Sequence, residues 1–349
     1  MTDSPAWRSP ASGAEAAGHE PARGLDERVR EDTHIKALDG LRGLAALTVA
    51  ISHFSNQTQM FDRLFGRGAG QLGVMLFFAL SGYLMGRLYL GQRPDSASLS
   101  VYFTRRVARV VPLYLAVVLA AFLIDQPTRF FPVNAQNLLH HLAFIEGQSD
   151  LWTIPVEIQF YLLFPVIWAA FRLVGRLAVI PLVAAAVVIA LLGYPKPIVL
   201  VPCFAYFALG IVISRLRVTR DLSVLFAGIL VLYVAAMPQV RISLGGMAVD
   251  PWRDPVYIVV IGGLLLATLH SKAADLTLGS RPWVFLGTIS YSFYLLHRPV
   301  LMAVKPLDIP VGAKMVLFLA AATLVAWLVY VLFERPMRIA IAGRRNHAR

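Results

Sequence analysis

Long apolar segments alternate with short polar segments along most of this chain. An α-helix needs about 20 apolar residues to cross the hydrocarbon core of a bilayer. From residue 37 onward the sequence has ten apolar segments close to this length, at 37–55, 72–90, 107–125, 155–172, 175–193, 197–216, 222–240, 255–271, 284–304 and 313–333. The pattern predicts an all-α, polytopic integral membrane bundle of about ten transmembrane helices.

Composition separates the two ends of the chain from this apolar region. The 349 residues are 58% hydrophobic and 15% charged. Residues 1–34 are rich in Ala, Gly, Pro and charged residues and contain Trp7 as their one aromatic residue, so we predict a disordered cytoplasmic tail there. The membrane domain is expected to cover residues 35–338, and a basic cytoplasmic tail to cover 339–349.

The basic residues predict an orientation in the membrane. If the N-terminus is cytoplasmic, 23 of the 32 Lys and Arg residues lie on the cytoplasmic side, as the positive-inside rule requires. We therefore expect a multi-pass protein of the plasma (inner) membrane with both termini in the cytoplasm. This asymmetry accounts for the net charge of +12 without a nucleic-acid partner. The single cysteine, Cys203, offers no thiol pair for a metal, and no metal site is predicted.

The first apolar segment carries two ionisable residues, Arg42 and His53. They are eleven positions apart, so they lie on one helical face about 16 Å apart along the axis. Ionisable groups within a span commonly face the bundle interior and mark a functional path. The alternative is that Arg42 extends to the lipid headgroups and that a neighbouring helix satisfies His53.

Two further sites place charge beside apolar segments. Arg106 and Arg109 are one helical turn apart and are suited to bind phosphate groups, although they could equally anchor the helix to lipid phosphate. Glu157 lies near the outer start of its segment, where a buried carboxylate needs a partner. His53 is expected at a similar depth and is the predicted partner, while exposure to water at the helix N-terminus is the alternative.

Three smaller polar groups complete the candidate site. Ser81 lies beside Gly82 at mid-depth, where small residues most often allow helices to approach closely. Tyr291 and His297 occur in a segment that also fits an aromatic belt and an interfacial helix end. We treat Ser81, Tyr291 and His297 as candidates for the substrate site.

Taken together, these segments resemble acyltransferase family 3, the polytopic membrane O-acyltransferases that modify sugars, cell-surface glycans and macrolides. The resemblance covers about residues 36–336 and rests on six motifs in the family's order, LDGLRG with Arg42 and His53, FFALSGYL, RRVARVVPLY, LWTIPVEIQFYLLFP, SYSFYLLHRPV and FERP. The chain departs from the family at Pro155–Gln159, where Glu157 is present but the second carboxylate of the family motif is absent.

The resemblance implies transfer of an acyl group, most often acetyl, from acyl-CoA to a hydroxyl of a sugar, a glycan or a glycosylated metabolite. His53 would be the general base or a transient acyl carrier, Glu157 would orient it, and Arg42 would hold the donor or stabilise the developing oxyanion. Arg106 and Arg109 would bind the CoA phosphates from the cytoplasm. Acyl-CoA is then a co-substrate, and no permanently bound cofactor is expected. A transporter or flippase is the alternative class, since aligned charges also describe a translocation path.

Overall fold

The computed structural model describes residues 35–124, 130–192, 200–247, 250–252 and 254–343. Every regular element in these ranges is helical, and no strand occurs among them. The contacts divide the chain into Met1–Ile35 and Lys36–Arg349, and all the helices described below belong to the second unit. In order they are α2 (Lys36–Thr58), α3 (Asp62–Phe65), α4 (Ala69–Tyr89), α5 (Ser96–Ile124), α6 (Leu138–Leu142), η1 (Ser149–Trp152), α7 (Thr153–Val174), η2 (Gly175–Ala178), α8 (Val179–Leu192), α9 (Leu200–Ile213), α10 (Ser223–Ala235), α11 (Pro238–Ser243), α12 (Pro255–Leu269), α13 (Lys272–Thr277), α14 (Arg281–Thr288), α15 (Ser290–Val304), α16 (Val311–Val329), η3 (Tyr330–Glu334) and α17 (Arg335–Gly343).

The predicted all-α architecture is confirmed for the described residues. Four helical stretches there are long and apolar enough to cross a membrane, Ala69–Tyr89, Ser96–Ile124, Ser149–Val188 and Val311–Gly343, and three shorter apolar helices accompany them, Leu200–Ile213, Ser223–Ala235 and Pro255–Leu269. The total of ten membrane-spanning helices stays a prediction. The apolar stretches support a multi-pass membrane location.

Two predicted boundaries differ from the structure. The segment 284–304 is divided at Ile289, where α14 ends and α15 begins. The C-terminal tail predicted at 339–349 begins inside α17, which continues to Gly343. The N-terminal tail predicted at 1–34 lies outside the described residues.

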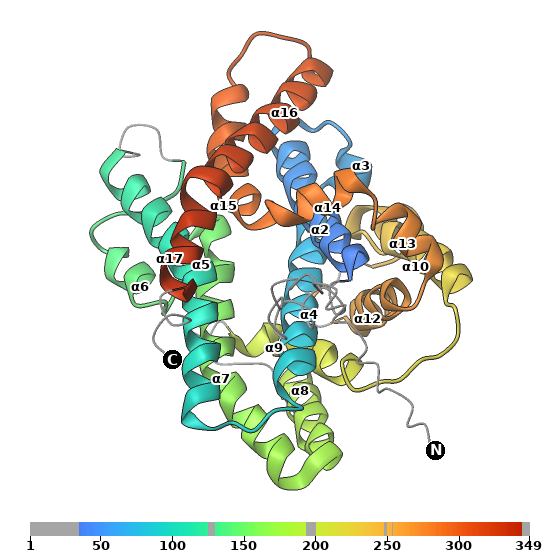
Figure 1. Cartoon of the computed structure of the whole chain (residues 1–349). Helices are drawn as coiled ribbons and strands as arrows, with labels where there is room; N and C mark the ends of the chain where they lie inside the picture. Colours follow the sequence, from blue (N-terminus) through green and yellow to red (C-terminus); the bar gives the residue numbers. More distant parts are fainter. Residues whose placement is uncertain (1–34, 125–129, 193–199, 248–249, 253, 344–349) are drawn as a thin grey trace, which may run out of the picture. The chain divides into compact units, whose positions relative to one another are not determined.

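Helix α4 packs closely between α2 and α9, and small residues make this possible. A Cβ on Gly73 would overlap the carbonyl oxygen of Ala45 in α2, and a Cβ on Gly82 would overlap that of Phe207 in α9. Backbones that approach this closely fix the helices relative to one another. Figure 1 shows α2 and α4 side by side near the middle of the helical unit.

The other side of α2 packs against α15 and α16. Ala46, Ala50 and Phe54 recur at intervals of four residues and belong to one buried apolar cluster with residues of α15 and α16. The rings of Phe54 and Phe318 stack with their centroids 5.5 Å apart. Because His53 precedes Phe54 in α2, this packing brings the imidazole beside α15.

Candidate active site

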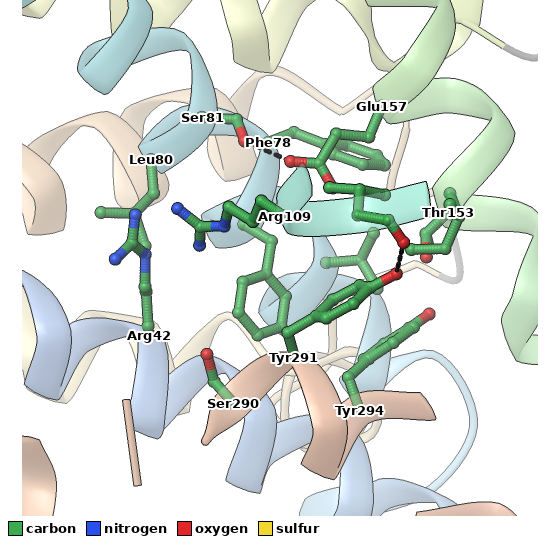
Figure 2. A pocket seen from close by; sticks show the side chains of 14 residues that line it. Arg42, Phe78, Leu80, Ser81, Arg109, Thr153, Glu157, Ser290, Tyr291 and Tyr294 are labelled. Carbon is green, nitrogen blue, oxygen red and sulfur yellow. Dashed lines mark hydrogen bonds between the residues drawn. The ribbon is translucent and has the colours of Figure 1, made fainter. Parts of the chain in front are cut away.

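A pocket lies between α2, α4, α5, α7 and α15, and most of the predicted site residues line it (Figure 2). Its polar lining comes from Arg42, Ser81, Arg109, Thr153, Glu157, Ser290, Tyr291 and Tyr294. The cavity has a volume of about 60 Å³, which is room for a few water molecules or one small acyl group at roughly 10–15 Å³ per water on this measure. It cannot hold a whole nucleotide.

Two arginines form one wall of the pocket. Figure 2 shows the guanidinium groups of Arg42 and Arg109 turned toward the same part of the cavity. Arg42 Nη1 donates to Asp39 Oδ1 at 3.1 Å, and the two side chains are each 15% exposed. This contact holds Arg42 in place and leaves the other guanidinium nitrogens available to an anionic or carbonyl oxygen.

The structure separates the two arginines that were predicted to act together. Arg109 lines the pocket, whereas Arg106 does not. Arg106 is 9% exposed, and its guanidinium carbon lies 5.8 Å from the centre of the Tyr161 ring. A cation over an aromatic face is a stabilising interaction, so Arg106 has a packing partner of its own.

Glu157 does not contact His53. Its Oε1 accepts a hydrogen bond from Ser81 Oγ at 2.8 Å and a second one from the Tyr161 hydroxyl. The carboxylate therefore belongs to the pocket beside Arg109, and the predicted pairing of His53 with Glu157 is wrong for this structure. Ser81 therefore has a hydrogen-bond partner in the pocket, which a role in close helix packing alone would not predict.

His53 instead contacts Asp150, in the short helix η1 that precedes α7. His53 Nδ1 lies 3.3 Å from Asp150 Oδ2 and 3.0 Å from His297 Nε2. Arg298 Nη1 lies 3.5 Å from the same carboxylate oxygen. Asp150 and Arg298 were not among the predicted site residues. Asp150 directly precedes the quoted motif LWTIPVEIQFYLLFP, and an acidic residue at the entrance to an apolar segment was the available signal.

The hydrogen bonds assign the protons on the two imidazoles. His297 Nδ1 lies 2.6 Å from the backbone carbonyl of Tyr294, and a carbonyl only accepts, so this nitrogen carries a proton. In the neutral ring His297 Nε2 is then an acceptor, and His53 Nδ1 must donate to it. His53 Nε2 is left with a free lone pair, and no hydrogen bond from the described residues reaches it.

The histidine network adjoins the pocket through Tyr294. The Tyr294 side chain lines the pocket, and its hydroxyl donates to the backbone oxygen of Asp150 at 2.9 Å. The backbone carbonyl of the same residue holds His297. One residue thus forms part of the pocket wall and positions both partners of His53.

His53, Asp150 and His297 could also be considered as metal ligands, since their donor atoms lie within 4.8 Å of one another. Arg298 argues against a cation here, because its guanidinium already lies against Asp150 Oδ2. The 3.0 Å separation of the imidazole nitrogens fits a direct hydrogen bond. The geometry favours a network in which a hydrogen bond to His297 orients His53 and the Asp150 carboxylate lies beside it as a counter-charge.

These features define a helical membrane protein in which an arginine-lined pocket adjoins a buried histidine–aspartate network. Residues 35–333 match the family model described as an acyltransferase domain, and the chain belongs to this family, acyltransferase family 3. The resemblance inferred from the six motifs is confirmed.

Several curated relatives are O-acetyltransferases. The chain is 26% identical to O-acetyltransferase OatA of Staphylococcus aureus over 89% of its length and 58% of the relative. It is 24% identical to peptidoglycan O-acetyltransferase OatA of Listeria monocytogenes over 87% of its length and 56% of the relative. It is 26% identical to putative peptidoglycan O-acetyltransferase YrhL of Bacillus subtilis, over 89% and 56% respectively. The chain thus spans less than two thirds of the length of these relatives, and no solved structure matches it.

Proposed function

We propose that this protein is a membrane O-acetyltransferase that moves an acetyl group from acetyl-CoA to a hydroxyl of a glycan. The observation that carries the proposal is the hydrogen bonding of His297, which accepts from His53 Nδ1 and thereby leaves a free lone pair on His53 Nε2. Family membership and the names of the relatives support an O-acyltransferase and favour the enzyme over a transporter or flippase. Peptidoglycan is the glycan named for two of those relatives.

His53 acts as the general base in this proposal. Nε2 takes the proton from the acceptor hydroxyl as its oxygen attacks the carbonyl carbon of the thioester. The positive charge that forms on His53 is stabilised by Asp150, whose carboxylate lies 3.3 Å away. When the carbon–sulfur bond breaks, the proton passes to the sulfur, and the products are an acetate ester and CoA. Transient acylation of His53 is the alternative and uses the same lone pair.

Arg42 and Arg109 act in the pocket, whose lining does not include His53. Arg109 and Arg42 are suited to hold the phosphates or the thioester oxygen of acetyl-CoA, which enters from the cytoplasm as a co-substrate. The nucleotide stays outside a cavity of about 60 Å³, and only the acyl end of the donor reaches toward His53. This division suits an enzyme of the plasma membrane with both termini in the cytoplasm. Tyr291 and Ser81 also belong to the pocket lining.

The experiment is acetyl transfer from radiolabelled acetyl-CoA by the purified chain in lipid vesicles, beside His53→Ala. We expect label on an added glycan acceptor with the wild type and at least a 1,000-fold slower reaction with the variant, the order of loss when a general base of a triad is removed. Equal transfer by a folded His53→Ala variant would refute the proposal. Label retained on the wild-type protein without an acceptor, and absent from the variant, would identify His53 as an acyl carrier.

A further inference from the structure

A second polar pocket lies outside the site described above, and the proposed mechanism does not use it. The turn between α3 and α4, the helix α11 and the segment before α12 form its walls. It has a volume of about 320 Å³ and is lined by Arg67, Gly68, Gln71, Pro238, Gln239, Arg241, Ile242, Met247, Pro251 and Tyr257. This volume is at the low end of the range of about 300–1,000 Å³ for small-molecule pockets, which suits a short piece of a larger chain.

The pocket combines positive charge with an unsatisfied acceptor. Arg67 is exposed and has no ion pair among the described residues. Arg241 is bonded to Asp254, which raises the pKa of the guanidinium and offsets its charge, and its guanidinium carbon lies 5.5 Å from the centre of the Tyr257 ring. The charge left for a ligand is therefore that of Arg67. Gln71 Oε1 is buried and has no hydrogen-bond partner. A buried oxygen in this state is costly unless a ligand or water donates to it.

The local sequence builds this arrangement. Gly68 has a φ of 92°, and a Cβ at this position would meet the ring of Pro238. The glycine therefore lets the chain turn closely against α11, with Arg67 before the turn and Gln71 after it. The side chains of Pro238, Pro251 and Met247 supply apolar contact beside the polar groups.

The walls of this pocket connect directly to the elements that hold the histidine network. Gly70 in α4 packs against Ser52, the residue before His53. The Trp252 ring, next to Pro251, contacts the Trp152 ring edge to face at 5.7 Å, and Trp152 ends the short helix that carries Asp150. The elements that line the pocket thus pack against the elements that carry His53 and Asp150.

We propose that this pocket binds the acceptor and that the acceptor is a carbohydrate that carries a carboxylate. Arg67 pairs with the carboxylate, Gln71 Oε1 accepts a hydrogen bond from an O–H or N–H group of the sugar, and the proline rings contact its C–H groups. The acceptor role rests on the proposed function, whereas binding of the anionic sugar does not. A phosphate of an anionic lipid headgroup offers a similar charge, and the test separates these two sources.

The test measures binding to the whole chain in nanodiscs of phosphatidylcholine, without acetyl-CoA. The probes are a soluble peptidoglycan disaccharide with a free carboxylate and the methyl ester of the same disaccharide. We expect the wild type to bind the acid at least tenfold more tightly than the ester, about the effect of one hydrogen bond to a charged group. Arg67→Ala should abolish this difference, and Arg63→Ala, on the neighbouring helix α3 but outside the pocket lining, should preserve it.

A second variant tests the acceptor atom. Gln71→Leu keeps the approximate size of the side chain and should weaken binding of acid and ester equally, because both retain the sugar's donor groups. The proposal is overturned if Arg67→Ala binds the acid as tightly as the wild type does, or if the wild type does not distinguish acid from ester. Inhibition of disaccharide binding by phosphatidylglycerol in the nanodisc, lost in Arg67→Ala, would assign the site to lipid and would also overturn it.

Transfer kinetics then separate this site from the proposed function. Arg67→Ala should raise the KM for the acidic disaccharide about tenfold with a nearly unchanged kcat, whereas His53→Ala should bind the disaccharide normally and fail to acetylate it. Arg67-dependent binding without any transfer by the wild type would refute the proposed acetyltransferase activity and support the proposed binding site. Transfer with a KM that is independent of Arg67 would refute the binding site and support the acetyltransferase activity.

Discussion

Replacing Asp150 by Asn tests whether this carboxylate, and not Glu157, supports His53. The substitution keeps the shape of the side chain and removes its charge. Asp150 Oδ2 lies 3.3 Å from His53 Nδ1, and at this distance an imidazolium and a carboxylate attract each other by about 5 kcal/mol with an effective dielectric constant of about 20.

Two features of the structure reduce this value. The His53 side chain is 25% exposed, so solvent screens part of the attraction, and Arg298 at 3.5 Å already neutralises part of the carboxylate charge. We therefore expect Asp150→Asn to raise the activation barrier by about 2–4 kcal/mol, which lowers kcat roughly 30- to 1,000-fold. The KM for acetyl-CoA should change little, because the arginines proposed to bind the donor line the pocket and Asp150 does not.

The assay is acetyl transfer at saturating acetyl-CoA and acceptor, with the amount of folded protein fixed by size-exclusion chromatography and thermal unfolding. Glu157→Gln is the matched variant, since its carboxylate bonds to Ser81 and Tyr161 rather than to His53. It should retain at least about ten times more activity than Asp150→Asn. The reasoning is refuted if folded Asp150→Asn keeps its kcat, or if Glu157→Gln loses more activity than Asp150→Asn.

Two further predictions concern the donor and the packing of the bundle. Arg109→Ala should raise the KM for acetyl-CoA about tenfold or more, because it removes a charge-assisted hydrogen bond. Arg105→Ala does not alter the pocket lining and should leave this KM unchanged. Equal KM values in the two variants would contradict the prediction. Gly82→Leu should lower the thermal stability strongly, because a side chain at this position would overlap the Phe207 carbonyl in α9. Gly228→Ala, where a Cβ meets open space, should leave the thermal stability unchanged or slightly higher. A stable Gly82→Leu variant would show that α4 and α9 can separate without cost.

The sequence predicted the helices because apolar segment length depends on local composition. The apolar length did not predict the break at Ile289, although the polar residues Thr288 and Ser290 flank it, because the apolar segment resumes after the junction. The spacing of Arg106 and Arg109 also could not predict that the two residues have different surroundings. Residues three positions apart on a helix differ in direction by about 60°, which is enough for Arg109 to reach the pocket while Arg106 packs on Tyr161.

The partner of His53 could not be predicted from apparent depth in the membrane. Glu157 is seven positions beyond Asp150, or about 10 Å further along if the whole stretch were helical. Because of this offset, Glu157 contacts Ser81 in the pocket and Asp150 contacts His53. The choice between the two carboxylates depends on how far η1 and α7 are shifted along α2, and this shift is set by packing between residues distant in the sequence.

The two partners of His53 have different roles in this network. His297 Nδ1 is bound to the Tyr294 carbonyl, which cannot take a proton, so His297 cannot pass the proton of His53 onward. Its contribution is to fix which nitrogen of His53 is protonated in the resting state. Asp150 contributes when His53 becomes charged, because its carboxylate is the nearest anion to the imidazolium. The proton removed from the acceptor therefore stays on His53 Nε2, where the departing thiolate of CoA can take it.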